Sequence, residues 1–155
     1  MGLIERILEE GCTAVDIGTQ SRKRTLEWIS ARAATAHSEL DADSILDALQ
    51  ARERLGSTGL GEGVAIPHCR TNCAQIIAVF ARLSEPVDFD APDGENVDLV
   101  FALIVPEEET ALHLTVLAHL SGVFGEAANL AALRAAPTAA ALRAKLLESA
   151  PQEDA

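Results

Sequence analysis

The chain has 155 residues, of which 48% are hydrophobic and 3% aromatic, and its formal net charge is -12. A single domain of this length buries roughly two-thirds of the surface of its unfolded chain, so the core must be built from Leu, Ile, Val and Ala. The negative charge argues against nucleic-acid partners, which need clustered Lys and Arg to displace counterions, and against anionic membrane surfaces.

The cysteines and the apolar runs indicate the compartment. Cys12, Cys69 and Cys73 are an odd number without disulfide-framework spacing, which suits a reducing cytosol. The first ten residues have early acids and lack the apolar stretch of a secretory signal, and the apolar run over residues 99–105 is too short to span a bilayer. We expect one cytoplasmic domain over residues 1–148 and a disordered tail over residues 149–155, with no insertion into membranes.

The first third of the chain is predicted to be mainly helical. Helical spacing of apolar residues predicts a helix over residues 3–8 that stops at Gly11, and residues 12–17 could form a strand. Ser21 is suited to cap a second helix, and Asp41 or Asp43 a third.

The third helix carries an arginine on its apolar side. Ile45, Leu49 and Arg52 lie at positions i, i+4 and i+7, so Arg52 points the same way as the apolar residues. Its guanidinium either reaches back to solvent or supplies a cation to a site near the following loop.

A glycine-dense stretch, G-S-T-G-L-G-E-G-V-A-I-P-H-C-R, occupies residues 56–70. Glycine at this density frees backbone N–H groups to approach an anion closely. Residues 64–66 read as a short buried strand that Pro67 stops, which leaves His68 at a strand end. The stretch could hold a bound anion, or His68 could itself carry a phosphoryl group.

The second half of the chain predicts strands followed by helices. Strands are expected over residues 75–83 and 97–105, with a turn-rich connection and a short strand near Val87 between them; the second strand is nearly all apolar and so is predicted to be central. Helices are expected over residues 110–124, with His113 in the first turn on the core side, and over residues 138–147. Because strands and helices alternate, we predict a two- or three-layer α/β sandwich.

Familiar site patterns are incomplete. The glycine stretch has Glu62 where a Walker A loop needs Lys, its glycines have the wrong spacing for a dinucleotide loop, and a helix precedes it. His68, Cys69 and Cys73 lie within six residues, but nothing completes a tetrahedral metal site, so no metal is expected. Cys69 as a nucleophile paired with His113 lacks a third, orienting group.

Three segments carry a resemblance to a known family. They are A-R-E-R-L-G-S-T-G-L-G-E-G-V-A-I-P-H-C-R at residues 51–70, P-V-D-F-D-A-P-D-G-E-N-V-D-L at residues 86–99, and V-D-L-V-F-A-L-I-V-P-E-E-E-T-A-L-H-L at residues 97–114, which continues into L-A-H-L. Together they resemble enzyme IIA of the fructose, mannitol and nitrogen-regulatory branches of the bacterial phosphotransferase system. The segment G-S-T-G-L-G is more similar to the nitrogen-regulatory type than to the sugar type.

The resemblance implies a fold and a site. The fold would be a single α/β domain whose central mixed β-sheet is flanked by helices on both faces. His68 would be the phosphoryl acceptor, with His113 as the second active-site histidine and Arg52 as the site arginine. The phosphoryl group would be bound by the loop, through the residues Ser57, Thr58, Gly59, Gly61, Glu62 and Gly63. Cys69 departs from the family pattern, which usually has glycine at this position. The backbone there must therefore accommodate a Cβ atom, and a thiol lies beside the site.

The resemblance also implies a function. The chain would be a phosphohistidine carrier, a cofactor-free transferase component that takes its phosphoryl group from an HPr-like (NPr) phosphocarrier. It would regulate targets such as a potassium transporter or a sensor kinase according to its phosphorylation state. One alternative is a fructose- or mannitol-type IIA that passes phosphate to a IIB domain, and another is an anion-binding regulatory module without a covalent step.

Overall fold

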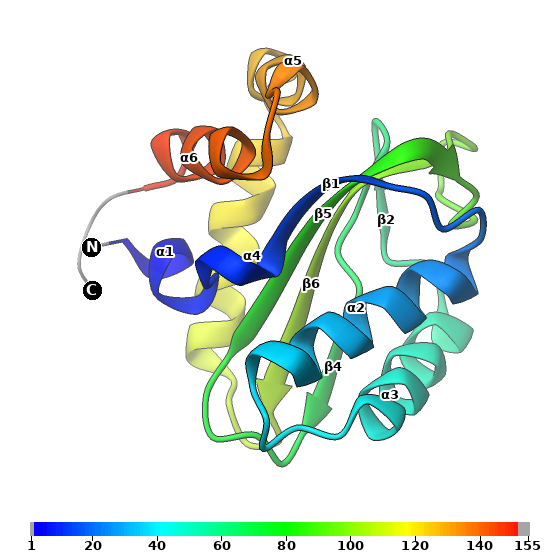
Figure 1. Cartoon of the computed structure of the whole chain (residues 1–155), viewed down its shortest axis with the longest axis vertical. Coiled ribbons are helices and arrows are strands. Elements are labelled where there is room, and N and C mark those ends of the chain that lie inside the picture. The colour runs from blue at the N-terminus through cyan, green and yellow to red at the C-terminus, as the bar shows by residue number, and fades with distance from the viewer. Residues whose placement is uncertain (1, 152–155) are drawn as a thin grey trace.

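A six-stranded mixed sheet forms the centre of the computed structural model, which describes residues 2–151 (Figure 1). The strand order is β1-β5-β6-β3-β2, and β4 pairs with β6 farther along the same edge as β3. The strands are β1 (Thr13–Ile17), β2 (Gly59–Gly61), β3 (Val64–Ala65), β4 (His68–Thr71), β5 (Ile77–Val87) and β6 (Val97–Pro106). Strand β6 is antiparallel to β5 and parallel to β3 and β4.

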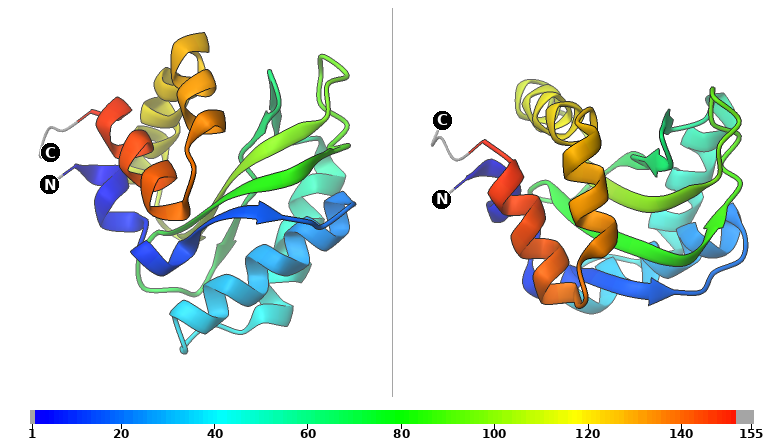
Figure 2. Two further views of the ribbon diagram at one scale, coloured as in Figure 1. Left: turned by 45° about the horizontal axis from the view of Figure 1, so that its top comes forward. Right: turned by 90° about the horizontal axis from the view of Figure 1, so that it is seen from above.

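Helices cover both faces of this sheet, as predicted. The helices are α1 (Leu3–Ile7), α2 (Arg22–Ala36), α3 (Ala42–Leu55), α4 (Ala111–Phe124), α5 (Ala127–Ala135) and α6 (Ala139–Ser149), with a 3₁₀ turn η1 (Glu10–Cys12). Figure 2 shows α2 and α3 on one side of the sheet and α1, α4 and α6 on the other. Within residues 2–151 no single helix is long and apolar enough to cross a membrane; α4 and α5 reach that length and composition only as a pair bent by 84°.

The predicted central strand is confirmed. In β6 every residue from Leu99 to Val105 is fully buried, because β5, β3 and β4 flank the strand and helices cover its faces. The predicted caps are also present: Ser21 Oγ accepts a hydrogen bond from the backbone N–H of Arg24, and an Asp41 carboxylate oxygen accepts one from that of Ser44.

The glycine-dense stretch forms a hairpin in which β2, a strand that was not predicted, precedes the predicted strand. Strands β2 and β3 pair antiparallel, and the two residues between them, Glu62 and Gly63, have φ angles of 57° and 80°. Positive φ at both central residues is the geometry of a type I′ turn, which matches the twist of a tight hairpin. Gly63 therefore serves the turn between the two strands, while Gly59 and Gly61 lie within β2.

Several element boundaries differ from those predicted. His68 begins β4 instead of lying at the end of a strand, because Pro67 interrupts the run along β6 and the chain then pairs with β6 again. Strand β5 continues through the expected turn to Val87, which pairs with Val97. Helix α5 was not predicted.

Both ends of the chain also differ from the prediction. Helix α1 ends at Ile7, one residue before the predicted end. Helix α6 ends at Ser149 and Ala150 is buried. Of the tail expected to be disordered, residues 152–155 lie outside the described residues.

The burial of β6 predicts where stability resides. Leu99→Ala should lower the free energy of unfolding by about 2–5 kcal/mol, because it leaves a cavity at a fully buried position. Leu114→Ala on α4, where the leucine is 65% exposed, should change it by less than about 0.5 kcal/mol. Urea unfolding of both variants measures the difference; equal losses would contradict a core centred on β6.

Candidate functional site

One pocket brings together His68, Arg52 and His113. Its lining comes from three elements: Ala48, Ala51, Arg52 and Leu55 from α3, His68, Cys69 and Arg70 from β4, and His113 from α4. The pocket has a volume of about 510 Å³. Arg52 and His113, which are 61 positions apart in the sequence, thus share one site with His68, as the sequence predicted for these three.

The sheet and α4 place the two histidines side by side. His68 starts β4 opposite Leu103 of β6, and the parallel β6 ends at Pro106, opposite Thr71 at the end of β4, before the chain enters α4. His113 is in the first turn of α4 and is buried. The two imidazole rings meet edge to face, with centroids 5.6 Å apart and planes at 69°.

Two hydrogen bonds assign the tautomer of His68. Nδ1 lies 2.9 Å from the carbonyl oxygen of Ile66, which only accepts, so Nδ1 carries the proton. Nε2 lies 3.3 Å from Nε of Arg52, a guanidinium nitrogen that only donates, so Nε2 holds the lone pair. The imidazole is therefore neutral, and its nucleophilic nitrogen, Nε2, faces the arginine.

Arg52 is held at the site by a second contact. Its Nη1 donates to the carbonyl oxygen of Gly56, 2.8 Å away, just beyond the end of α3. Of the two alternatives that the sequence left open for Arg52, the structure shows a cation directed at the site. The guanidinium lies beside Nε2, the atom to which a transferred group would bond.

Burial keeps His113 neutral. Desolvation, followed by the nearby His68 and Arg70, lowers the pKa of His113 below its usual 6.5, and the Glu109 carboxylate partly opposes this. Its Nδ1 atom is buried and makes no hydrogen bond to any part of residues 2–151. His113 therefore presents an uncharged imidazole edge to the pocket.

Cys69 fits the site without strain. It lies within β4, paired with Ile104, and is not among the non-glycine residues with positive φ, so the backbone accepts its Cβ. Burial and the neighbouring Cys73 raise the pKa of the Cys69 thiol to about 12. Because the thiolate is the reactive form, this cysteine is a poor nucleophile at neutral pH.

The predicted phosphoryl-binding loop lies elsewhere. None of the six residues of this set, Ser57, Thr58, Gly59, Gly61, Glu62 and Gly63, lines the His68 pocket. Ser57 Oγ donates to the carbonyl oxygen of Phe89, and Thr58 Oγ1 donates to the buried carboxylate of Glu53. Both hydroxyls thus fasten the start of the hairpin to the body of the domain.

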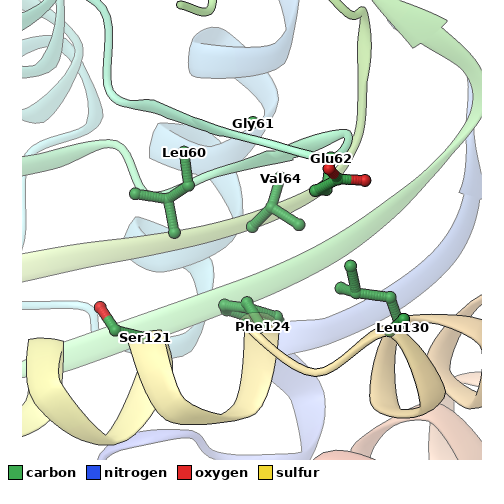
Figure 3. A pocket seen from close by; sticks show the side chains of 9 residues that line it. Leu60, Gly61, Glu62, Val64, Ser121, Phe124 and Leu130 are labelled. Atoms are coloured by element: carbon green, nitrogen blue, oxygen red, sulfur yellow. The ribbon is translucent and has the colours of Figure 1, made fainter. Parts of the chain in front are cut away.

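The hairpin itself borders a different pocket. Figure 3 shows Leu60 and Val64 pointing from the hairpin towards Phe124 of α4 and Leu130 of α5, with Glu62 at the rim. This second pocket has a volume of about 470 Å³. The backbone N–H of Glu62 donates to Asp93, so it is used within the protein.

Sequence reasoning missed two residues near the site, Glu53 and Arg70. Glu53 is only 7% exposed; it accepts from Thr58 and lies 3.5 Å from Arg22. Its position four residues after the buried Leu49 could have shown that it points inward. Arg70 lies two residues after His68, a spacing that places both on one side of a strand, but the strand β4 was not predicted.

Comparisons with known proteins identify the family of the chain. The family model described as the phosphoenolpyruvate-dependent sugar phosphotransferase system, EIIA 2, matches residues 6–149. The chain belongs to this family. It is an EIIA component of the phosphotransferase system, that is, a phosphotransfer protein.

Two relatives are of the nitrogen-regulatory type. The chain is 46% identical to the nitrogen regulatory protein of Pseudomonas aeruginosa over 140 residues, which cover 90% of this chain and 91% of that one. The crystal structure of nitrogen regulatory protein IIA-Ntr from Neisseria meningitidis superimposes with a TM-score of 0.88 at 42% identity, covering 94% of this chain and 99% of that one. The resemblance and the fold class that the sequence predicted are thereby confirmed.

A more distant structure shares the fold. The Escherichia coli complex of enzyme IIA for mannitol with phosphorylated enzyme IIB matches with a TM-score of 0.72 at 18% identity, covering 91% of this chain and 99% of that one.

No three His, Cys, Asp or Glu side chains gather as a metal site would require anywhere in residues 2–151.

The lowered pKa of His113 predicts a pH dependence of stability. Between the folded-state pKa and the unfolded value of about 6.5, the unfolded chain binds more protons, so the free energy of unfolding should rise with pH there. His113→Gln should flatten this rise. Urea unfolding at half-unit steps from pH 5 to 7.5 measures it, and an identical slope in wild type and His113→Gln would contradict the assignment.

Proposed function

We propose that the chain is a phosphohistidine carrier that accepts a phosphoryl group on Nε2 of His68 from a phosphorylated HPr-like carrier. The observation that carries the proposal is the hydrogen-bond pair at His68: the Ile66 carbonyl holds the proton on Nδ1 and leaves the Nε2 lone pair beside Arg52. A neutral imidazole nitrogen with a lone pair is the nucleophile that attack on phosphorus requires.

Transfer then requires few protein groups. The Nε2 lone pair attacks phosphorus in line, and the phosphorus–nitrogen bond of the donor breaks with its electron pair returning to the donor imidazole. As positive charge develops on the His68 ring, the Nδ1–H bond to the Ile66 carbonyl strengthens and stabilises it. Arg52, already hydrogen-bonded to Nε2, turns its donors to the phosphoryl oxygens.

His113 has a supporting role in this proposal. Its neutral ring, 5.6 Å from that of His68, can donate one hydrogen bond to a phosphoryl oxygen. Once the phosphoryl group is present, its negative charge favours the imidazolium form of His113, which adds a compensating charge. The loop hydroxyls of Ser57 and Thr58 are not included in the proposed site, because both have other partners.

The surface beside the pocket suits a protein donor. Leu55, at the end of α3, is 85% exposed and lines the pocket together with Ala48 and Ala51. An apolar edge next to the acceptor nitrogen gives a carrier protein a surface to bury while its phosphohistidine reaches Nε2.

We further propose a regulatory role rather than delivery of phosphate to a sugar transporter. The support is that relatives at 42% and 46% identity are nitrogen regulatory proteins, whereas the mannitol protein seen with a phosphorylated IIB partner is 18% identical. In this proposal target proteins, such as a potassium transporter or a sensor kinase, distinguish the phosphorylated from the free form. A gene for a membrane IIC component next to this one would contradict it.

Labelling tests the carrier step. With radiolabelled phosphoenolpyruvate, enzyme I and an HPr-type carrier, the chain should take up one acid-labile phosphate, and His68→Ala should take up none. His37→Ala is the matched control, because His37 lies near Glu9 and outside the pocket. It should label like wild type.

Two results would overturn the proposal. Equal labelling of His68→Ala would place the phosphate on another residue. An unlabelled wild type that nevertheless binds inorganic phosphate at this pocket would support an anion-binding module instead.

A further inference from the structure

The turn between β6 and α4 is held by one guanidinium nitrogen. Nη1 of Arg70, on β4, donates to the carbonyl oxygens of Pro106 at 3.2 Å and Glu107 at 3.3 Å, and also to that of Glu109. These carbonyls belong to three of the four residues of the turn over residues 106–109, which leads into α4. A single side chain from a neighbouring strand thus contacts three backbone acceptors, of which the Pro106 carbonyl also accepts from the backbone N–H of Glu109, and joins the turn to β4.

The start of α4 depends on that turn. Its N-cap residue, Thr110, makes no side-chain capping bond; instead a carboxylate oxygen of Glu109 accepts from the backbone N–H of Leu112 at 3.3 Å. Glu109 therefore caps the helix with its side chain and accepts a hydrogen bond from Arg70 with its backbone carbonyl. His113 follows directly in the first turn, so the place of its ring is set through Arg70 and Glu109.

The same short strand also carries the acceptor. His68 and Arg70 are two residues apart in β4, so both side chains lie on one side of the strand, and both line the pocket. Strand β4 therefore carries both the acceptor, His68, and Arg70, which contacts the turn that leads to His113.

We propose that Arg70 is a positioning residue that fixes His113 against His68 by holding the turn over residues 106–109. That Arg70 holds the turn is argued from the three carbonyl contacts. That it thereby speeds phosphoryl transfer rests on the function proposed above. Arg70 acts through the turn, and its loss should displace the first turn of α4 without unfolding the domain.

The chain contains a matched control for this arrangement. Nη1 of Arg82, on β5, donates to the carbonyl oxygens of Leu133, Arg134 and Ala136 at 3.0, 3.3 and 2.6 Å. Arg82 thus contacts three carbonyl oxygens through one nitrogen, as Arg70 does, where α5 leads into α6. Arg82 does not line the His68 pocket, so Arg82→Met removes an equivalent set of bonds away from the site.

The structural part is tested by amide hydrogen exchange and by NMR titration of His113. Arg70→Met should speed exchange of the Leu112 and Leu114 amides at least about tenfold and should raise the pKa of His113, because a cation is lost and the ring gains water. Arg82→Met should change neither. Arg70→Lys should retain both properties, since an ammonium has three donors. Unchanged exchange in Arg70→Met would overturn the proposal.

The kinetic part is tested by phosphoryl transfer from the phosphorylated carrier. A positioning role predicts that Arg70→Met lowers the rate at saturating donor by roughly tenfold to a hundredfold, leaves the half-saturating donor concentration unchanged, and has no further effect in a His113→Ala background. A raised half-saturating concentration that persists in that background would show donor docking and overturn it. If wild type itself accepts no phosphate, the proposed function fails, while exchange and titration still decide the role of Arg70.

Discussion

The hydrogen bond from Nδ1 of His68 to the carbonyl oxygen of Ile66 decides which edge of the imidazole faces the pocket. The carbonyl belongs to the backbone two residues earlier, so the ring orientation is built into the chain path at Pro67. With Nδ1 occupied, Nε2 is the nitrogen with a lone pair, and Arg52 is the donor that meets it. The rest of the site depends on this choice of tautomer.

The fold serves this bond by bringing a short strand back to β6. The chain pairs with β6 at Val64–Ala65, leaves it at Ile66, and returns at Pro67, whose carbonyl oxygen accepts from the backbone N–H of Leu103 before His68 begins β4. The interruption frees the Ile66 carbonyl to turn to the imidazole, while β6, buried over its whole central part, keeps both short strands in register. The Glu53–Thr58 contact and the Arg52–Gly56 contact then tie the end of α3 to the residues that precede the hairpin.

Local patterns in the sequence were enough for some of this. The continuous apolar run of β6 predicted a central strand, and the spacing of Ile45, Leu49 and Arg52 predicted that the arginine lies on the apolar side of its helix. The places of His68 after a predicted strand and of His113 in the first turn of a predicted helix set them apart from the other two histidines, and the family resemblance then implied their roles.

Other features depend on contacts that the sequence does not show. The glycine-dense stretch suggested a nest for a phosphoryl group, but Ser57 and Thr58 are bonded to Phe89 and Glu53, and their neighbours form a hairpin turn. Strand β4 was missed because four residues after a proline carry no periodic signal, and its role comes from pairing with β6 about 35 residues later. Arg70 could be understood only when that strand was known.

The identity of the modified nitrogen tests the account most directly. After phosphorylation by the carrier system, long-range proton–nitrogen NMR of the imidazole should show phosphorus on Nε2 of His68 and a proton on Nδ1; the unphosphorylated protein should show the same proton on Nδ1. Phosphorus on Nδ1, or an unphosphorylated ring with its proton on Nε2, would contradict the claim that the Ile66 carbonyl sets the tautomer.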